Sequence, residues 1–118
     1  MGRRASARLR LALPARFTAI SGTQNCIIVD LSRTGARLAV VRPVAAGQQG
    51  YVELGRFELF GSIVRLEQRS GGGLNAISFD EPLAKAQVLE IRRYAEHFAE
   101  RESAALREQA RRWVSGQP

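Results

Sequence analysis

Residues 26–41 of the chain read CIIVDLSRTGARLAVV. Two apolar runs flank a short polar connection, which is the pattern of two strands joined by a turn. Within the connection, Asp30 and Ser32 can hydrogen-bond the turn backbone, and Gly35 can adopt a positive φ. The stretch therefore predicts two consecutive strands with residues 30–35 as the tight connection between them.

Strand signals continue on both sides of this pair. Upstream, arginine and leucine alternate in residues 8–13, as in a half-buried strand, and Pro14 is expected to end that strand or to place it at an edge. Downstream, Gly55 and the glycine-rich residues 70–73 separate further β-rich runs, and Gly61 indicates a bulge or a close-packing point. We expect strands at 8–13, 26–30, 36–41, 51–54, 57–67 and 74–79. This pattern predicts a mainly β fold, a six-stranded antiparallel barrel, because closure removes exposed sheet edges.

The composition changes beyond the last expected strand. Pro82 suits a first helical position, and no further glycine or proline follows until Gly116, so one long C-terminal α-helix is expected. Apolar residues recur at three- and four-residue spacing from Val88 to Trp113. The first half of this helix is expected to pack on the barrel, whereas the second half either pairs with another helix, giving a homo-oligomer, or stays solvated. We divide the chain into an arginine-rich arm (1–8), a barrel (9–80) and a helix (81–115).

The positive charge of the chain is concentrated near its start. The net charge is +7, and residues 1–42 hold eight arginines and a single acid, Asp30, whereas residues 43–118 hold ten basic and ten acidic side chains. Such a region attracts an anion, whether phosphate, nucleic acid or an acidic membrane surface. Arginine in particular forks onto phosphate oxygens and guanine edges and stacks on bases.

Two short motifs lie in this region. Arg4 and Arg8 have the form RxxxR, a spacing that recurs elsewhere in this arginine-rich chain, and Asp30, Ser32 and Gly35 have the more specific form DxSxxG. One interpretation is purely structural, because DxSxxG is good turn chemistry. The functional interpretation is that Asp30 accepts hydrogen bonds from the N1–H and N2–H edge of a guanine, while the two arginines donate to phosphate and to guanine O6 and N7.

These motifs, six short strands and a C-terminal helix resemble the PilZ domain family, bacterial receptors for the second messenger cyclic di-GMP. The resemblance covers the chain from about Arg3 to Phe98. One departure lies in the last strand, where family members often carry glycine in a Gly-x-x-Phe pattern and this chain has Asn75 or Ala76.

The resemblance implies a ligand site and a mechanism. The arginines at positions 4 and 8 would hold phosphates and guanine edges, and the DxSxxG residues would line the opposite side of the ligand. An arginine at position 3 goes with an intercalated ligand dimer in this family, which implies two cyclic di-GMP molecules per protomer. The arm would become ordered on binding and, with the helix, would signal to a downstream protein partner in motility, exopolysaccharide synthesis or adhesion. The predicted ligand residues are Arg3, Arg4, Arg8, Asp30, Ser32 and Gly35.

Other functions are less well supported by the residues. A small-barrel RNA- or DNA-binding protein would also carry a basic arm, but it needs aromatic residues on its binding strands, and those of this chain are dispersed. A helical adaptor that uses the barrel only as a platform is a further alternative. No catalytic or metal-binding set is evident, because Cys26 lies in an apolar run and His97 lies among glutamates. We expect no enzyme activity and no cofactor, and, with neither a membrane span nor a signal core, a cytoplasmic location.

Overall fold

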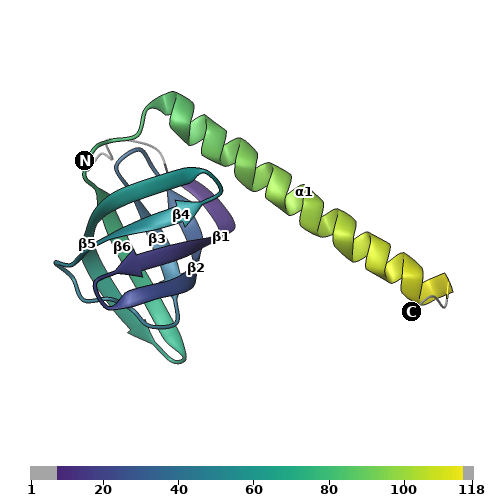
Figure 1. Cartoon of the computed structure of the whole chain (residues 1–118), viewed down its shortest axis with the longest axis horizontal. Helices are drawn as coiled ribbons and strands as arrows, with labels where there is room; N and C mark the ends of the chain where they lie inside the picture. Colours follow the sequence, from purple (N-terminus) through teal and green to yellow (C-terminus); the bar gives the residue numbers. More distant parts are fainter. Residues whose placement is uncertain (1–7, 116–118) are drawn as a thin grey trace, which may run out of the picture.

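The computed structural model describes residues 8–115, and it describes only the backbone of residues 105–107 and 109–115. Within this range the chain forms a closed barrel of six antiparallel strands and one long helix (Figure 1). The strand order around the barrel is β1-β2-β3-β6-β5-β4. The elements are β1 (Leu9–Ala19), β2 (Gly22–Leu31), β3 (Gly35–Val40), β4 (Gln49–Leu54), β5 (Phe57–Arg69), β6 (Gly72–Phe79) and α1 (Lys85–Ser115). The predicted six-stranded antiparallel barrel with a C-terminal helix is confirmed.

Every strand contributes to one apolar core inside the barrel. Inward-facing side chains alternate with outward-facing ones, so each strand buries one apolar face. Each strand contributes at least one almost fully buried side chain; in the order β1 to β6 these include Phe17, Ile28, Leu38, Val52, Ile63 and Ile77. Cys26 is buried in the same cluster, which confirms its interpretation as a core residue.

The structure decides between the alternatives that the sequence left open at Pro14 and Gly61. Pro14 does not end the first strand, because β1 continues to Ala19. Its missing N–H is tolerated because Pro14 pairs only with β2, and the pairing of β1 with β4 starts at Arg16. On β5 the register shift lies between Ile63 and Arg65 rather than at Gly61. Gly61 is instead the close-packing point, since a Cβ there would lie 2.2 Å from the backbone oxygen of Ser78.

Asn75, one of the two residues found where a glycine was expected, acts as an internal clamp. Its side chain is fully buried, and its amide bonds both the N–H and the carbonyl of Val44, at 2.7 and 2.8 Å, and the carbonyl of Arg65 at 3.2 Å. A buried amide is stable only when its polar atoms are paired. Asn75 therefore ties the β3–β4 connection to the irregular part of β5.

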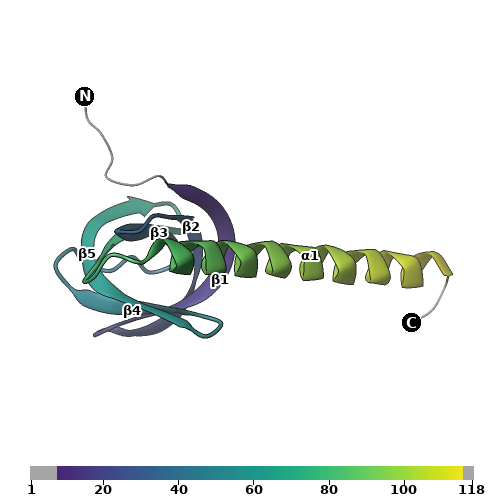
Figure 2. The same cartoon turned by 90° about the horizontal axis from the view of Figure 1, so that it is seen from above.

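The helix leaves one end of the barrel and projects well beyond it (Figures 1 and 2). Ile91 is fully buried in the barrel core, and Tyr94 packs edge-on against Phe57 and closely over Gly55 in the β4–β5 turn. The helix begins at Lys85 rather than at Pro82. No helix in the described part of the chain combines the length and apolarity needed to cross a membrane.

Candidate functional site

Asp30 lies on the outer surface of the barrel because the strand pairing is irregular next to it. The registers of both β2 ladders shift around Val29, between Ile28 and Asp30 on the β3 side. Without a shift, Asp30 would share the inward face of Cys26 and Ile28. With it, Leu31 becomes the inward residue, and Asp30 pairs in register with two arginines, Arg10 on β1 and Arg37 on β3.

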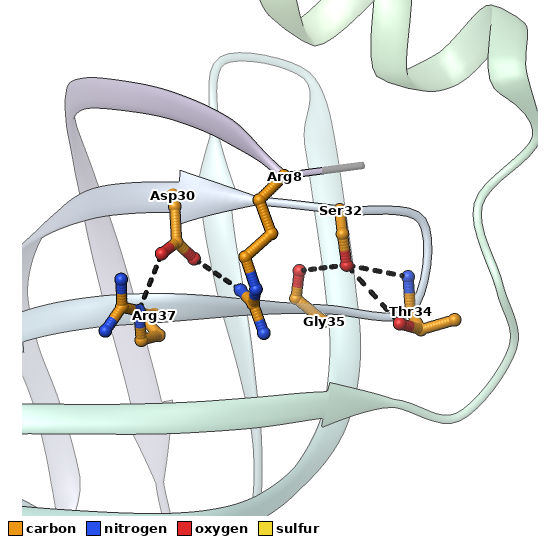
Figure 3. A network of polar contacts seen from close by, with 6 residues as sticks. All are labelled: Arg8, Asp30, Ser32, Thr34, Gly35 and Arg37. Carbon is orange, nitrogen blue, oxygen red and sulfur yellow. Dashed lines mark hydrogen bonds and ion pairs between the residues drawn. The ribbon is translucent and has the colours of Figure 1, made fainter. Parts of the chain in front are cut away.

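Two arginines bind the carboxylate of Asp30, Arg8 from just before β1 and Arg37 from β3 (Figure 3). Arg8 Nη1 donates to Oδ1 at 2.7 Å, and Arg37 Nε donates to Oδ2 at 2.6 Å. The Asp30 side chain is only 3% exposed, whereas those of Arg8 and Arg37 are 38% and 43% exposed. The outer-face carboxylate is thus covered by two guanidinium groups that themselves reach solvent. Ion pairs of this kind orient both partners because the hydrogen bonds are charge-assisted.

Ser32 organises the turn that follows Asp30 (Figure 3). Its backbone N–H donates to the carbonyl of Gly35 at 2.8 Å, and its buried Oγ accepts from the N–H of Thr34 at 3.2 Å. The same hydroxyl lies 3.3 Å from Oγ1 of Thr34 and 3.4 Å from the carbonyl of Gly35. A serine side chain that hydrogen-bonds the turn backbone in this way stabilises the turn.

Gly35 is required here for a different reason from the one predicted. It does not adopt a positive φ; the glycines that do are Gly22, Gly47, Gly55, Gly71 and Gly72. Instead, a Cβ at position 35 would lie 2.5 Å from the backbone oxygen of Ile77. The glycine therefore allows β6 to approach the turn, which brings the DxSxxG motif next to the end of the barrel.

Arg33, at a variable position of the motif, connects this turn to the start of the helix. Its Nε donates to the carbonyl of Leu83 at 2.7 Å, and the N–H of Leu83 donates back to the Arg33 carbonyl at 2.7 Å. The N–H of Phe79 donates to the carbonyl of Thr34 at 2.8 Å. These bonds hold Phe79 and Leu83 against the β2–β3 turn. The helix starts only at Lys85, with Gln87 Oε1 accepting the N–H of Ala84.

A hollow of about 570 Å³ lies beside Asp30, lined by Arg10, Leu11, Ala12, Val29, Asp30 and Arg37. Arg10 and Arg37 are thus polar members of this surface that the sequence analysis did not single out. The register of a hairpin closed at residues 32–35 would have revealed Arg37, since it places that residue opposite Asp30.

The structure brings four of the six predicted ligand residues together. Arg8 and Asp30 are in direct contact, and Ser32 and Gly35 form the adjoining turn. Arg3 and Arg4 lie outside the described residues. The part of the chain that is described holds no cluster of three or more side chains suited to a metal ion.

The two side chains considered for catalysis lie elsewhere. Burial raises the pKa of the Cys26 thiol from 9.0 to about 11, so the thiol stays protonated near neutral pH. His97 is on α1, where its side chain is 75% exposed and 3.5 Å from Glu100.

Comparison with known proteins agrees with this architecture. A model of the PilZ domain matches residues 2–97. The solved structure of the inhibitor of motility MotI/DgrA of Bacillus subtilis resembles the chain with a TM-score of 0.55 at 12% identity, over 86% of this chain and 53% of that one. YcgR of Escherichia coli, solved in complex with c-di-GMP, gives a TM-score of 0.47 at 16% identity, over 93% of this chain and 50% of that one. The chain therefore spans about half the length of either structure. No curated protein matches it.

Proposed function

The chain belongs to the PilZ domain family, and on that premise we propose that it is a receptor for cyclic di-GMP rather than an enzyme. The proposal is that ligand binding changes the position of the arm and of α1 and so regulates a protein partner, for example in motility, exopolysaccharide synthesis or adhesion. We further propose Arg3, Arg4, Arg8, Asp30, Ser32 and Gly35 as the ligand-binding residues.

The observation that carries the proposal is the contact between Arg8 and Asp30. It joins the end of the RxxxR motif to the beginning of the DxSxxG motif across 22 residues of sequence. A guanine nucleotide presents an anionic phosphate at one end and the N–H edge of its base at the other. Arginine and carboxylate, placed side by side, supply the matching partners for these two groups.

Binding requires a rearrangement at Asp30. An ionised carboxylate offers about four acceptor positions, of which Arg8 and Arg37 occupy two. Two positions remain for the N1–H and N2–H groups of a guanine, but a side chain that is 3% exposed cannot receive them without movement of its cover. We propose that Arg8 exchanges Asp30 for a ligand phosphate while Arg37 keeps the carboxylate oriented.

The Arg33–Leu83 connection offers a route from the ligand to the helix. The turn that would contact cyclic di-GMP and the segment that precedes α1 share two hydrogen bonds of 2.7 Å. A ligand that binds two conformations with different affinity shifts their populations. Displacement of the turn would thus move the start of α1.

Nucleic-acid binding is less compatible with the barrel surface. Phe60 and Tyr51 are the aromatic pair on the outside of β4 and β5, and Glu58 and Asp80 lie beside Phe60. Carboxylates next to a stacking platform repel a phosphate backbone, so this face lacks the electrostatics that such proteins use.

Calorimetric titration of the full chain with cyclic di-GMP tests the proposal. We expect two ligand molecules per protomer and a loss of affinity of at least about tenfold in Arg4→Ala, Arg8→Ala and Asp30→Ala, because each loses a charge-assisted contact. Arg69→Ala is the matched control, since Arg69 lies in the β5–β6 hairpin and pairs only with Glu67. A flat thermogram from folded protein, or full affinity in Asp30→Ala, would refute the assignment.

A further inference from the structure

The outer surface of the β4–β5 pair carries two aromatic rings, Tyr51 and Phe60, that α1 does not cover. Tyr51 and Phe60 are register partners, and their ring centroids are 5.3 Å apart. Phe60 is 51% exposed. In both views of the molecule α1 runs past the barrel without crossing the outside of β4 (Figures 1 and 2). Exposed apolar surface of this kind commonly marks a contact site.

The rings stand between two adjoining hollows. One, of about 480 Å³, is lined by Glu58, Phe60, Asp80 and Glu81 and by the segment that leads to α1. The other, of about 320 Å³, is lined by Tyr51 and again by Phe60 and Asp80. The two hollows share Phe60 and Asp80 as lining residues, and the Asp80 N–H donates to the Phe60 carbonyl at 3.0 Å. The surface has room for an inserted side chain.

Charge identifies the kind of side chain that fits. The chain is strongly basic, yet neither hollow is lined by an arginine or a lysine, and Glu58, Asp80 and Glu81 form no ion pair with any described residue. Glu58 also faces Glu53 directly across the β4–β5 ladder. Glu53 in turn has Arg16 as its register partner on β1, so the carboxylates of this surface left without an ion pair among the described residues are those of the hollows, Glu58, Asp80 and Glu81. A cation is the group that complements them.

We propose that this Tyr51–Phe60 face, formed by Tyr51, Glu58, Phe60, Asp80 and Glu81, docks an arginine-bearing segment of a partner protein. A guanidinium group can stack on an aromatic ring and at the same time fork onto a carboxylate, which an ammonium group cannot do. The surface is separate from Asp30. Leu83 also lines the larger hollow, and its carbonyl accepts a hydrogen bond from Arg33 in the β2–β3 turn. The segment before α1 is therefore shared by the partner-docking face and the proposed ligand switch.

Titration of the isotope-labelled full chain with a capped Ala-Arg-Ala-Arg-Ala peptide, followed by NMR, tests the proposal. We expect saturable shifts centred on Tyr51, Phe60 and Asp80, and none with the same peptide in which neutral citrulline replaces arginine. Phe60→Leu and Asp80→Asn should each weaken binding about threefold to fivefold, as expected for the loss of an exposed cation–π contact or ion pair. Both variants are tested so that a local folding defect in one of them cannot by itself explain weaker binding.

Matched controls are available on the same strand. Val64→Ala removes a similarly exposed apolar side chain of β5, and Glu67→Gln removes a carboxylate that is already paired with Arg69; both should bind the peptide normally. Shifts centred on other carboxylates, or full affinity in Phe60→Leu, would overturn the proposal. So would self-association that Phe60→Leu abolishes, since the occupant would then be a second copy of the chain. Phe60→Leu should still bind cyclic di-GMP, which separates this test from that of the proposed receptor function.

Discussion

Asp30 combines an outward position with nearly complete burial. A carboxylate in that situation is stabilised only when charged partners replace its lost hydration. Arg8 and Arg37 supply them, and both guanidinium groups reach solvent, where an arriving anion can contact them. The residue that we propose to read a guanine is therefore held by two cations that an anionic ligand can reach.

Gly35 provides a residue-scale test of the turn. Gly35→Ala introduces a methyl group 2.5 Å from the Ile77 carbonyl oxygen, so either β3 or β6 must shift. We expect a loss of about 1–3 kcal/mol of unfolding free energy, as for other overpacked sites, measured by urea denaturation. Gly71→Asn is the contrast, since position 71 has φ +78° and open space around it, conditions that asparagine tolerates. Equal stability of Gly35→Ala and the wild type would contradict the close approach.

Cys26 makes stability depend on alkaline pH. Below its unfolded pKa of 9.0 the thiol is protonated in both states, but between 9.0 and about 11 only the unfolded chain ionises. Rising pH therefore favours unfolding, and this one group should remove about 2 kcal/mol of stability by pH 10.5. Urea denaturation at pH 8 and 10.5 measures the loss. Cys26→Ala should lose correspondingly less between the two values, and identical losses would show that the thiol is not responsible.

At the scale of elements, the β2–β3 turn and the start of α1 form one hydrogen-bonded unit. The backbone bond from Leu83 to Arg33 would survive loss of the arginine side chain, but the bond from the guanidinium group would not. The connection therefore depends in part on the side chain of Arg33, which occupies a position that the DxSxxG pattern leaves variable.

Arg33→Ala should loosen this unit without unfolding the barrel. We expect faster amide hydrogen exchange in residues 83–91, unchanged exchange in the strands, and a loss of about 1–2 kcal/mol of unfolding free energy. Arg42→Ala, which alters an exposed arginine just after β3, should change none of these. Unaltered exchange at Leu83 in Arg33→Ala would contradict the coupling.

At the scale of the whole molecule, only part of the helix packs against the barrel. Helix side chains that pack against the core run from Val88 to Phe98, less than half the length of α1. The remainder projects away from the barrel (Figure 1). Its apolar residues include Leu106 and Trp113, which are one heptad apart in the sequence.

Truncation after Glu100 tests what this projecting part does. Since every described core contact is retained, we expect the unfolding free energy to change by no more than about 0.5 kcal/mol. Size-exclusion chromatography separates the two alternatives for this part of the helix: an oligomer that becomes a monomer on truncation indicates helix pairing, and a monomer in both cases indicates a solvated helix. A full chain that elutes as a monomer would contradict helix-mediated assembly, and a large loss of stability would show that residues 101–115 support the barrel.

The sequence by itself determined the elements and their chemistry. Alternation of apolar residues, the turn at residues 30–35 and the glycine-rich connections predict six strands and a closed barrel, and the uninterrupted stretch before Gly116 predicts the helix. These signals are local, because side-chain periodicity and turn preference act over a few residues. The clustering of arginine and the two motifs were equally visible without a structure.

Only the tertiary structure decided which side chains meet. The register shift that turns Asp30 outward and the bond from Arg33 to Leu83 depend on how distant segments are aligned around the barrel, whereas the pairing of Asp30 with Arg37 follows from the hairpin turn itself. A shift of one residue reverses the face of every side chain in a strand, and no short pattern encodes it. The role of Gly35 was misread for the same reason, since its constraint comes from β6, more than forty residues further along the chain.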